Sequence, residues 1–176
     1  PMCGSGTIII EGALMALNIA PGINRSFTAE SWSQCPPEVW EKERAAARAE
    51  ERHDIEFRAY GTDIDTEALI TARANARRAG VEKYVSFKRA DVKDFSPVTE
   101  KATVICNPPY GERLLDAEGA HAIYKTLGER FTPQKGRSYE IITADEDFEK
   151  LFGRKADKRR KLYNGMIKCQ VYMYFK

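Results

Sequence analysis

The stretch Phe57–Asp63 (FRAYGTD) decides the fold class together with the two segments that follow it. It predicts a strand, and Asp65 can cap a helix over Thr66–Ala79 that Gly80 ends. Tyr84–Arg89 (YVSFKR) alternates between apolar and polar residues, as a second strand does. A strand, a helix and a strand in this order form the repeating unit of a parallel sheet covered by helices.

The same alternation extends over the rest of the chain. The first expected helix is apolar almost all round, as in a helix buried against a sheet, whereas the second is charged and faces solvent. The other expected elements are helices over Thr7–Asn18, Glu38–Arg52, Gly119–Phe131 and Asp145–Phe152, and strands over Thr103–Cys106 and Tyr139–Thr143.

The end of the chain has a different pattern. Asn164-Gly165 lies between two β-prone runs, Arg160–Tyr163 and Ile167–Phe175, and this is a strong signal for a hairpin. We therefore expect an α/β domain with a mainly parallel sheet, helices on both faces and one antiparallel strand near an edge.

Composition excludes several classes of protein. The 176 residues suit one domain, and 43% hydrophobic with 31% charged residues exclude a disordered or fibrous chain. A net charge of +2 gives no overall preference for a polyanion. The absence of a long apolar run predicts no membrane span, and the spacing of the four cysteines fits neither a metal site nor a disulfide framework. We expect a cytoplasmic protein without a metal site.

The chain opens on Pro1-Met2-Cys3-Gly4-Ser5-Gly6, a turn that normally connects a strand to a helix. No strand precedes it, so we expect residues 1–176 to be an N-terminally truncated domain. Glycines let the backbone approach a ligand, and the helix that follows offers unpaired N–H groups. The turn is not a Walker loop, because no Gly-Lys-Ser/Thr follows, and it can equally be structural.

Asp63 ends one expected strand and Asp91 follows another, at the edge where doubly wound sheets bind ligands. Asp63 can accept hydrogen bonds from a ribose diol, although an inserted loop and helix place it further from Gly6 than in the simple nucleotide-binding unit. Asp91 can accept from an exocyclic amino group of a purine, or it can be an ordinary turn residue.

Asn107-Pro108-Pro109-Tyr110 directly follows the strand Thr103–Cys106 and is a more specific signal. Two successive prolines fix their φ angles and donate no backbone hydrogen bonds, so their carbonyls and the Asn107 amide form a rigid set of acceptors. Tyr110 adds a flat surface for a base. Such a site suits an amino group on a planar ring.

These residues carry a resemblance to a known family. Asn107-Pro108-Pro109-Tyr110 resembles the catalytic motif of class I S-adenosylmethionine (SAM)-dependent amino-methyltransferases. Pro1–Thr7 (PMCGSGT) resembles the first cofactor motif in the form used by guanine 2-amino (N2) methyltransferases of bacterial large-subunit (23S) ribosomal RNA. Asn18–Phe27 (NIAPGINRSF) and Lys161–Cys169 (KLYNGMIKC) are similar to the same family, so the resemblance covers nearly the whole chain.

The resemblance implies a Rossmann-like seven-stranded sheet whose last strand is antiparallel, with the first strand missing from this chain. It also implies an RNA-binding module of the THUMP type upstream in the full-length protein, rRNA or a pre-ribosomal particle as partner, and no membrane. The catalytic residues would be Asn107, Pro108 and Tyr110. The cofactor S-adenosylmethionine would be bound by Cys3, Gly4, Gly6, Thr7, Asp63, Ile64, Asp91, Val92 and Asn107.

Two other functions stay open. The same four-residue motif serves adenine-N6 methyltransferases that act on DNA, and a domain without turnover could bind SAM and RNA as a ribosome-assembly module. RNA contact would have to come from local charge, for which the basic run Arg154–Lys161 is a candidate. Arg25, Phe27 and Arg113 are alternative contacts.

Overall fold

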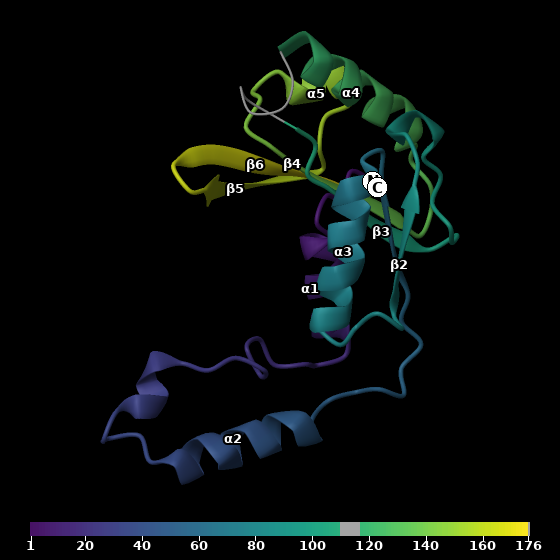
Figure 1. Cartoon of the computed structure of the whole chain (residues 1–176). Coiled ribbons are helices and arrows are strands. Elements are labelled where there is room, and N and C mark those ends of the chain that lie inside the picture. Colours follow the sequence, from purple (N-terminus) through teal and green to yellow (C-terminus); the bar gives the residue numbers. More distant parts are fainter. Residues whose placement is uncertain (110–116, 176) are drawn as a thin grey trace.

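The structure is a computed structural model that describes residues 1–109 and 117–175, and Figure 1 shows their arrangement. The helices are α1 (Thr7–Ala16), α2 (Pro37–Ala49), α3 (Thr66–Arg78), α4 (Ala117–Arg130) and α5 (Phe148–Phe152). The strands are β1 (Ala59–Asp63), β2 (Val85–Arg89), β3 (Ala102–Cys106), β4 (Arg137–Thr143), β5 (Lys158–Asn164) and β6 (Ile167–Tyr174). Two short 3₁₀ turns are η1 (Thr28–Ser31) and η2 (Val92–Asp94).

Every expected helix and strand is present within a few residues of its expected bounds. Asp65 caps α3, because its Oδ1 accepts a hydrogen bond from the Glu67 amide at 2.9 Å. The two 3₁₀ turns were not expected. No helix in the described part of the chain is long and apolar enough to span a bilayer.

The strands form two sheets in the described residues, whereas the sequence favours a single one. β1 and β2 pair in parallel from Ala59↔Val85 to Asp63↔Arg89. The second sheet has the order β3-β4-β6-β5, in which β3 and β4 are parallel and β6 is antiparallel to both of its neighbours. The expectation of parallel pairing closed by an antiparallel hairpin is confirmed, but β1 and β3 do not pair with each other.

The larger core lies between the second sheet and the helices α4 and α5. Its centre is aromatic: the Phe131 and Tyr139 rings stack at 4.8 Å, and Phe148 lies 4.7 Å from Tyr172. Because Tyr172 and Val171 are adjacent in β6 and both are buried, this strand is covered on both faces. The hairpin is therefore held by its base in the core.

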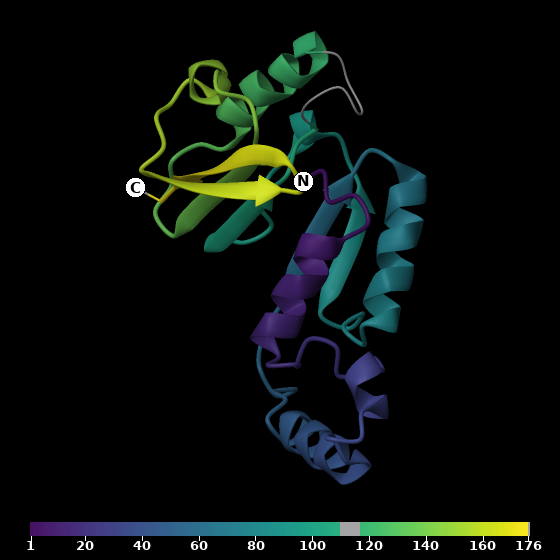
Figure 2. The same ribbon diagram turned by 90° about the vertical axis from the view of Figure 1, so that its left-hand side faces the viewer.

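A smaller core joins α1 and α3 to the sheet of β1 and β2. It contains Ile10 and Ala13 of α1 and Leu17 directly after it, together with Ala76 of α3 and Val81, which follows α3. Figures 1 and 2 show α1 and α3 packed next to each other beside these strands. This packing fixes the start of α1, and with it the glycine turn.

Residues 18–52 form an arm that projects from the lower end of the domain in Figures 1 and 2. Its base is closed by a hydrogen bond from the Arg52 amide to the Leu17 carbonyl at 2.7 Å. Inside the arm the Phe27 and Trp40 rings stack at 5.7 Å. No residue of α2 is buried, as its charged sequence predicts.

Candidate cofactor and substrate site

A cavity of about 830 Å³ lies beyond the carboxyl ends of β1 and β3. This is the edge at which doubly wound sheets bind ligands, and the volume suits a nucleoside-sized molecule. Five segments far apart in the sequence contribute to it. Its lining is Pro1–Ser5, Thr7, Ile8, Ile9, Asp63–Asp65, Ala68, Ile105, Asn107–Pro109, Ile123, Asn164 and Ile167.

The glycine turn is tied to the end of β1 through Asp63. The Gly4 amide donates to Asp63 Oδ2 at 2.8 Å, and the Asp65 amide donates to Asp63 Oδ1 at 3.0 Å. A carboxylate oxygen has two acceptor sites, so both oxygens keep capacity for a further donor. Asp63 therefore holds the turn in place and still presents acceptors to the cavity.

Two glycines are needed in this turn for different reasons. Gly4 has a φ of +52°, and a side chain there would extend into open space in the cavity. Gly6 has a φ of +80°, and a Cβ there would lie 3.0 Å from the Ala72 Cβ and the Phe87 ring. Gly4 thus leaves room for a ligand, whereas Gly6 lets α1 approach α3 and β2 closely.

Cys3 lines the same cavity as Asp63. Burial, and after it the negative charge of Asp63, raises the pKa of the Cys3 thiol above its ordinary value. The Cys3 amide donates to the Thr62 carbonyl at 3.0 Å, so the chain entering the turn runs along the free edge of β1. Cys3 contributes a neutral, weakly polar surface.

Asn107 and Pro108 meet the glycine turn across the cavity. Asn107 is exposed and lines the cavity, and Pro108 beside it is fully buried. Burial of the proline ring anchors the segment, because the residue is fixed both by its own ring and by its surroundings. The Asn107 side chain is accessible to a ligand, as a catalytic role requires.

Three lining residues come from segments in which the sequence predicts no site residue. Ile123 comes from α4, and Asn164 and Ile167 flank the turn of the β5–β6 hairpin. The Asn164-Gly165 pair predicts the hairpin, but nothing in the local sequence indicates that its end reaches the mouth of the cavity. That relationship depends on the strand order β4-β6-β5.

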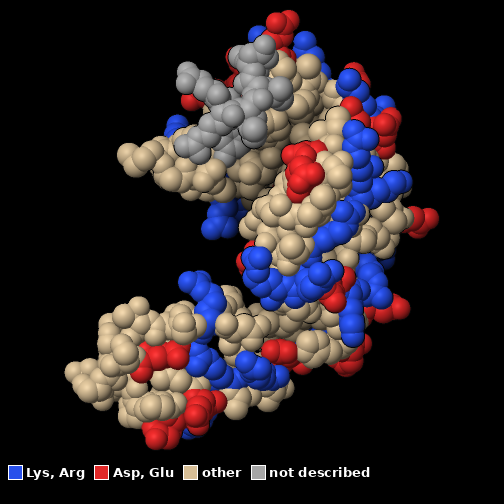
Figure 3. Space-filling model, viewed as in Figure 1, with Lys and Arg blue, Asp and Glu red and all other residues tan. Residues whose placement is uncertain are grey.

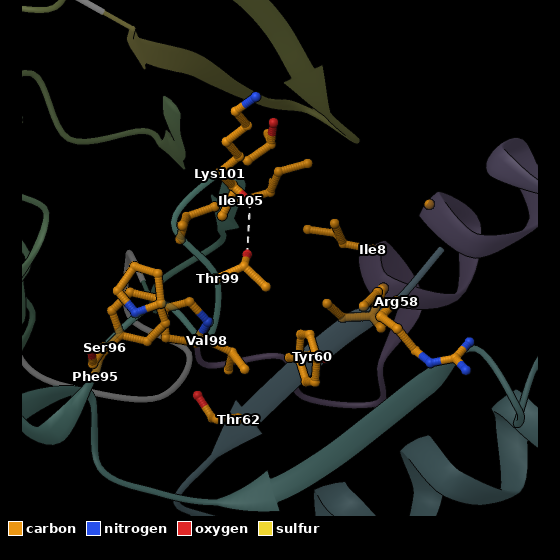
Figure 4. A pocket seen from close by; sticks show the side chains of 18 of the residues that line it. Ile8, Arg58, Tyr60, Thr62, Phe95, Ser96, Val98, Thr99, Lys101 and Ile105 are labelled. Carbon is orange, nitrogen blue, oxygen red and sulfur yellow. Dashed lines mark hydrogen bonds between the residues drawn. The ribbon is translucent and has the colours of Figure 1, made fainter. Parts of the chain in front are cut away.

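A second cavity, of about 430 Å³, lies between the facing edges of β1 and β3 (Figure 4). Tyr60 and Thr62 of β1, Ile105 of β3, Ile8 of α1 and Val98 are among its lining residues. The exposed fractions of Tyr60 and Val98 are 42% and 67%, which is high for apolar side chains facing the interior of a domain. Among residues 1–109 and 117–175, no strand pairs with these edges of β1 and β3, and both edges face one apolar space.

Comparison with known proteins identifies the family. The family model described as an RMKL-like methyltransferase domain matches residues 1–173. The chain belongs to this family. It is 41% identical to YpsC of Bacillus subtilis and 40% identical to the ribosomal RNA large subunit methyltransferase K/L of Shewanella baltica, in both cases over 99% of its length. It spans 46% of YpsC and 25% of the K/L protein.

Similar solved structures identify the fold of this RMKL-like methyltransferase domain. SMU.472, crystallised in complex with SAH, matches with a TM-score of 0.94 and 43% identity over 99% of this chain and 46% of its own. A Listeria monocytogenes protein described as a "predicted N6-adenine-specific DNA methylase" matches with a TM-score of 0.90 and 39% identity, over 99% of this chain and 45% of its own. The domain has the α/β methyltransferase fold.

Of the expected cofactor residues, Cys3, Gly4, Thr7, Asp63, Ile64 and Asn107 line the first cavity of this RMKL-like domain. Gly6, Asp91 and Val92 do not line it. Asp91 caps η2, since its Oδ1 accepts from the Lys93 amide at 2.9 Å, and Val92 packs against the larger core. Tyr110 and Arg113 lie outside the described residues.

Two residues of the basic run Arg154–Lys161 make contacts within the fold, and three others are exposed on the surface. Arg154 lies over the Tyr174 ring at 4.7 Å and donates to the Phe131 carbonyl at 3.1 Å, and Arg159 pairs with Glu149. Lys158, Arg160 and Lys161 remain exposed on β5. In the described ranges, no group of three or more His, Cys, Asp or Glu side chains could hold a metal ion.

Proposed function

We propose that this domain transfers a methyl group from S-adenosylmethionine to the exocyclic 2-amino group of a guanine in RNA, with 23S rRNA as the substrate class. The observation that carries the proposal is the meeting of Gly4, Asp63 and Asn107 in one cavity. Membership of a methyltransferase family, SAH in the SMU.472 structure and the name of the K/L relative support it.

The cavity residues fit the cofactor. Space is open above Gly4, and Asp63 can accept from a ribose hydroxyl while it holds the Gly4 amide. We propose that Ile64 packs beside the ribose and that Asp91 and Val92 meet the adenine ring. The remaining cofactor contacts would come from Cys3, Gly4, Gly6, Thr7 and Asn107.

When bound, S-adenosylmethionine supplies a methyl group on a positively charged sulfur. The target amine is a weak nucleophile, because its lone pair is delocalised into the purine ring. Asn107 Oδ1 and the Pro108 carbonyl would accept its two hydrogens and localise that pair toward the methyl carbon. The N–C bond forms as the S–C bond breaks, the sulfur keeps the electron pair, and the amine loses its proton afterwards. Tyr110 would stack on the target base after it flips out of its helix.

A mixture of cellular RNA and DNA tests the substrate class. RNA and DNA from cells lacking the protein would be incubated with the natural protein and isotope-labelled S-adenosylmethionine, then digested to nucleosides for mass spectrometry. We expect the label in 2-methylguanosine from the large-subunit rRNA. Label in N6-methyladenine of DNA would instead establish the second candidate, which the Listeria relative's name favours. Cofactor binding without any label would establish a binding module without turnover.

We also propose that one extended segment, the first strand that the resemblance implies, fills the second cavity. The unpaired edges of β1 and β3, the apolar lining between them and the hydrogen bond from Cys3 to Thr62 support this. An upstream RNA-binding module of the THUMP type belongs to the same proposal. YpsC and the K/L protein are longer than this chain, which is compatible with such a module. Residues 1–176 produced alone are then expected to bind SAH much more weakly than the natural protein in calorimetry.

A further inference from the structure

The end of the β5–β6 hairpin exposes an unusual amount of apolar surface. The exposed fractions are 60% for Tyr163, 97% for Met166 and 39% for Ile167. We call these three residues the hairpin tip. In Figure 3 this end of the hairpin is the tan projection at the upper left. Turns are ordinarily polar, so three exposed apolar side chains next to Asn164-Gly165 indicate a binding surface at this end of the hairpin.

The hairpin tip adjoins the cavity that contains Asn107. Ile167 of the tip, and Asn164 paired with it at the end of the strand ladder, both line that cavity. Tyr163 and Met166 do not line it, but each is next to one of these residues in the chain, at the same end of the hairpin. A molecule whose reactive base occupies the cavity would have its neighbouring parts close to this end of the hairpin, within reach of both of its faces.

Positive charge surrounds the tip. Arg160, Lys161 and Lys168 are exposed on the two strands. Lys161 Nζ lies 5.0 Å from the centre of the Tyr163 ring, and Lys168 is the cross-strand partner of Tyr163. A hydrogen bond with Lys161, together with the charges of both lysines, lowers the pKa of the Tyr163 hydroxyl. An aromatic face beside cations is the combination that binds unpaired nucleic acid through stacking and phosphate contacts.

The hairpin is rigid enough to position such a surface. Seven residue pairs join β5 and β6, from Lys158↔Met173 to Asn164↔Ile167. At its base, Glu149 of α5 accepts from the Ala156 amide at 2.9 Å and from Arg159. Cys169 and Val171 of β6 are buried. The base of the hairpin is therefore held in place by the core, which limits the order that has to be gained on binding.

We infer that the hairpin tip is the surface on which the unpaired RNA next to the methylated base docks. The Tyr163 ring would stack on a flanking base, Met166 would cover its edge, and Lys161 and Lys168 would contact the adjoining phosphates. This inference rests on the proposed function, because it takes RNA as the substrate of the cavity.

The test compares Tyr163→Ala, Tyr163→Phe and Met166→Ala in the natural full-length protein. The RNA probe is large-subunit rRNA from cells lacking the protein. We expect Tyr163→Ala to raise KM for this RNA about tenfold or more, the effect of losing one stacked base, while Tyr163→Phe stays close to the natural protein. SAH affinity is expected to be unchanged, since Tyr163 does not line the cavity. Met15→Ala is the matched control: Met15 is 80% exposed, but it lies on α1.

Crosslinking provides a readout that does not depend on turnover. RNA containing 4-thiouridine is irradiated with the protein in the presence of SAH, and we expect the crosslinked peptide to contain Tyr163 or Met166. Crosslinks confined to other segments, or an unchanged KM in Tyr163→Ala, would overturn the inference while RNA methylation by the natural protein persists. Failure of the natural protein to methylate any RNA would instead overturn the proposed function.

Discussion

The Gly4 amide donates a hydrogen bond to Asp63 Oδ2 at 2.8 Å, across 59 positions of sequence. One carboxylate therefore holds the glycine turn against the end of β1 and also faces the cavity. Loss of this carboxylate should affect the shape of the turn and the contacts of a bound ligand at once.

Asp63→Ala is expected to raise the dissociation constant of SAH about tenfold or more, because hydrogen bonds to a charged acceptor are lost. Isothermal titration calorimetry measures this directly. Asp157→Asn is the control: Asp157 Oδ2 also accepts from a backbone amide, that of Phe175 at 2.8 Å, but it does not line the cavity. Equal weakening in both variants would contradict a specific role for Asp63.

Gly6→Ala tests whether close packing positions the start of α1. The new Cβ would lie 3.0 Å from the Ala72 Cβ in a backbone with a φ of +80°, so we expect a loss of about 2 kcal/mol or more in unfolding free energy. Gly80→Ala separates the cost of crowding from the cost of the backbone conformation. Gly80 has a φ of +75°, but a Cβ added there would meet nothing within 4 Å, so only the backbone cost of about 1–2 kcal/mol applies. Denaturant unfolding that gives equal losses would show that crowding at Gly6 has no effect.

The sequence predicts the elements well, because each depends on local signals. Asn164-Gly165 specifies the hairpin, and Asp65 with Gly80 specifies the ends of α3. It also predicts that Asp63 and Asn107 meet, since Asp63 ends one strand and Asn107 follows another, and the carboxyl ends of parallel strands share one edge.

What the sequence leaves open depends on strand order and on side-chain orientation. No local pattern places β6 between β4 and β5, so the approach of Ile167 to the cavity could not be foreseen. The two interpretations of Asp91 could not be separated either, because an aspartate after a strand can cap the next turn or face a ligand. Its side chain caps η2, and the adenine contact stays a prediction.

Glu149 makes the stability of the folded state depend on pH in a predictable direction. Partial burial acts to raise the pKa of Glu149, but hydrogen bonds from Arg159 and from the Ala156 amide outweigh it and hold the pKa below its ordinary value of 4.5. Because the pKa is lower in the folded protein, the ionised Glu149 carboxylate stabilises the folded state at pH values above the ordinary pKa. The stabilisation is lost as the pH falls through the pKa of the folded protein.

Glu149→Gln is therefore expected to lower Tm by about 2 °C at pH 7, with the difference shrinking as the pH falls below about 4. Thermal unfolding followed by circular dichroism between pH 3 and 8 checks it. Glu146→Gln, an exposed neighbour in the chain, should change Tm little at any pH. A Glu149→Gln deficit that stays constant down to about pH 3 would exclude the ionised carboxylate as its cause.

Substitution of Asn107 distinguishes a role of this side chain in catalysis from a role in cofactor binding. Asn107→Ala is expected to leave SAH affinity within several-fold, while methyl transfer falls by about 10² or more because a hydrogen bond made in the transition state is lost. Calorimetry with SAH and single-turnover transfer to rRNA measure the two effects. Asn18→Ala is the control, since Asn18 also uses its amide, donating to the Glu50 carbonyl at 3.0 Å, but at the base of the arm. Parallel losses of affinity and rate in Asn107→Ala would mean that this side chain shapes the cavity, and the Pro108 carbonyl would then be left as the acceptor that orients the amine.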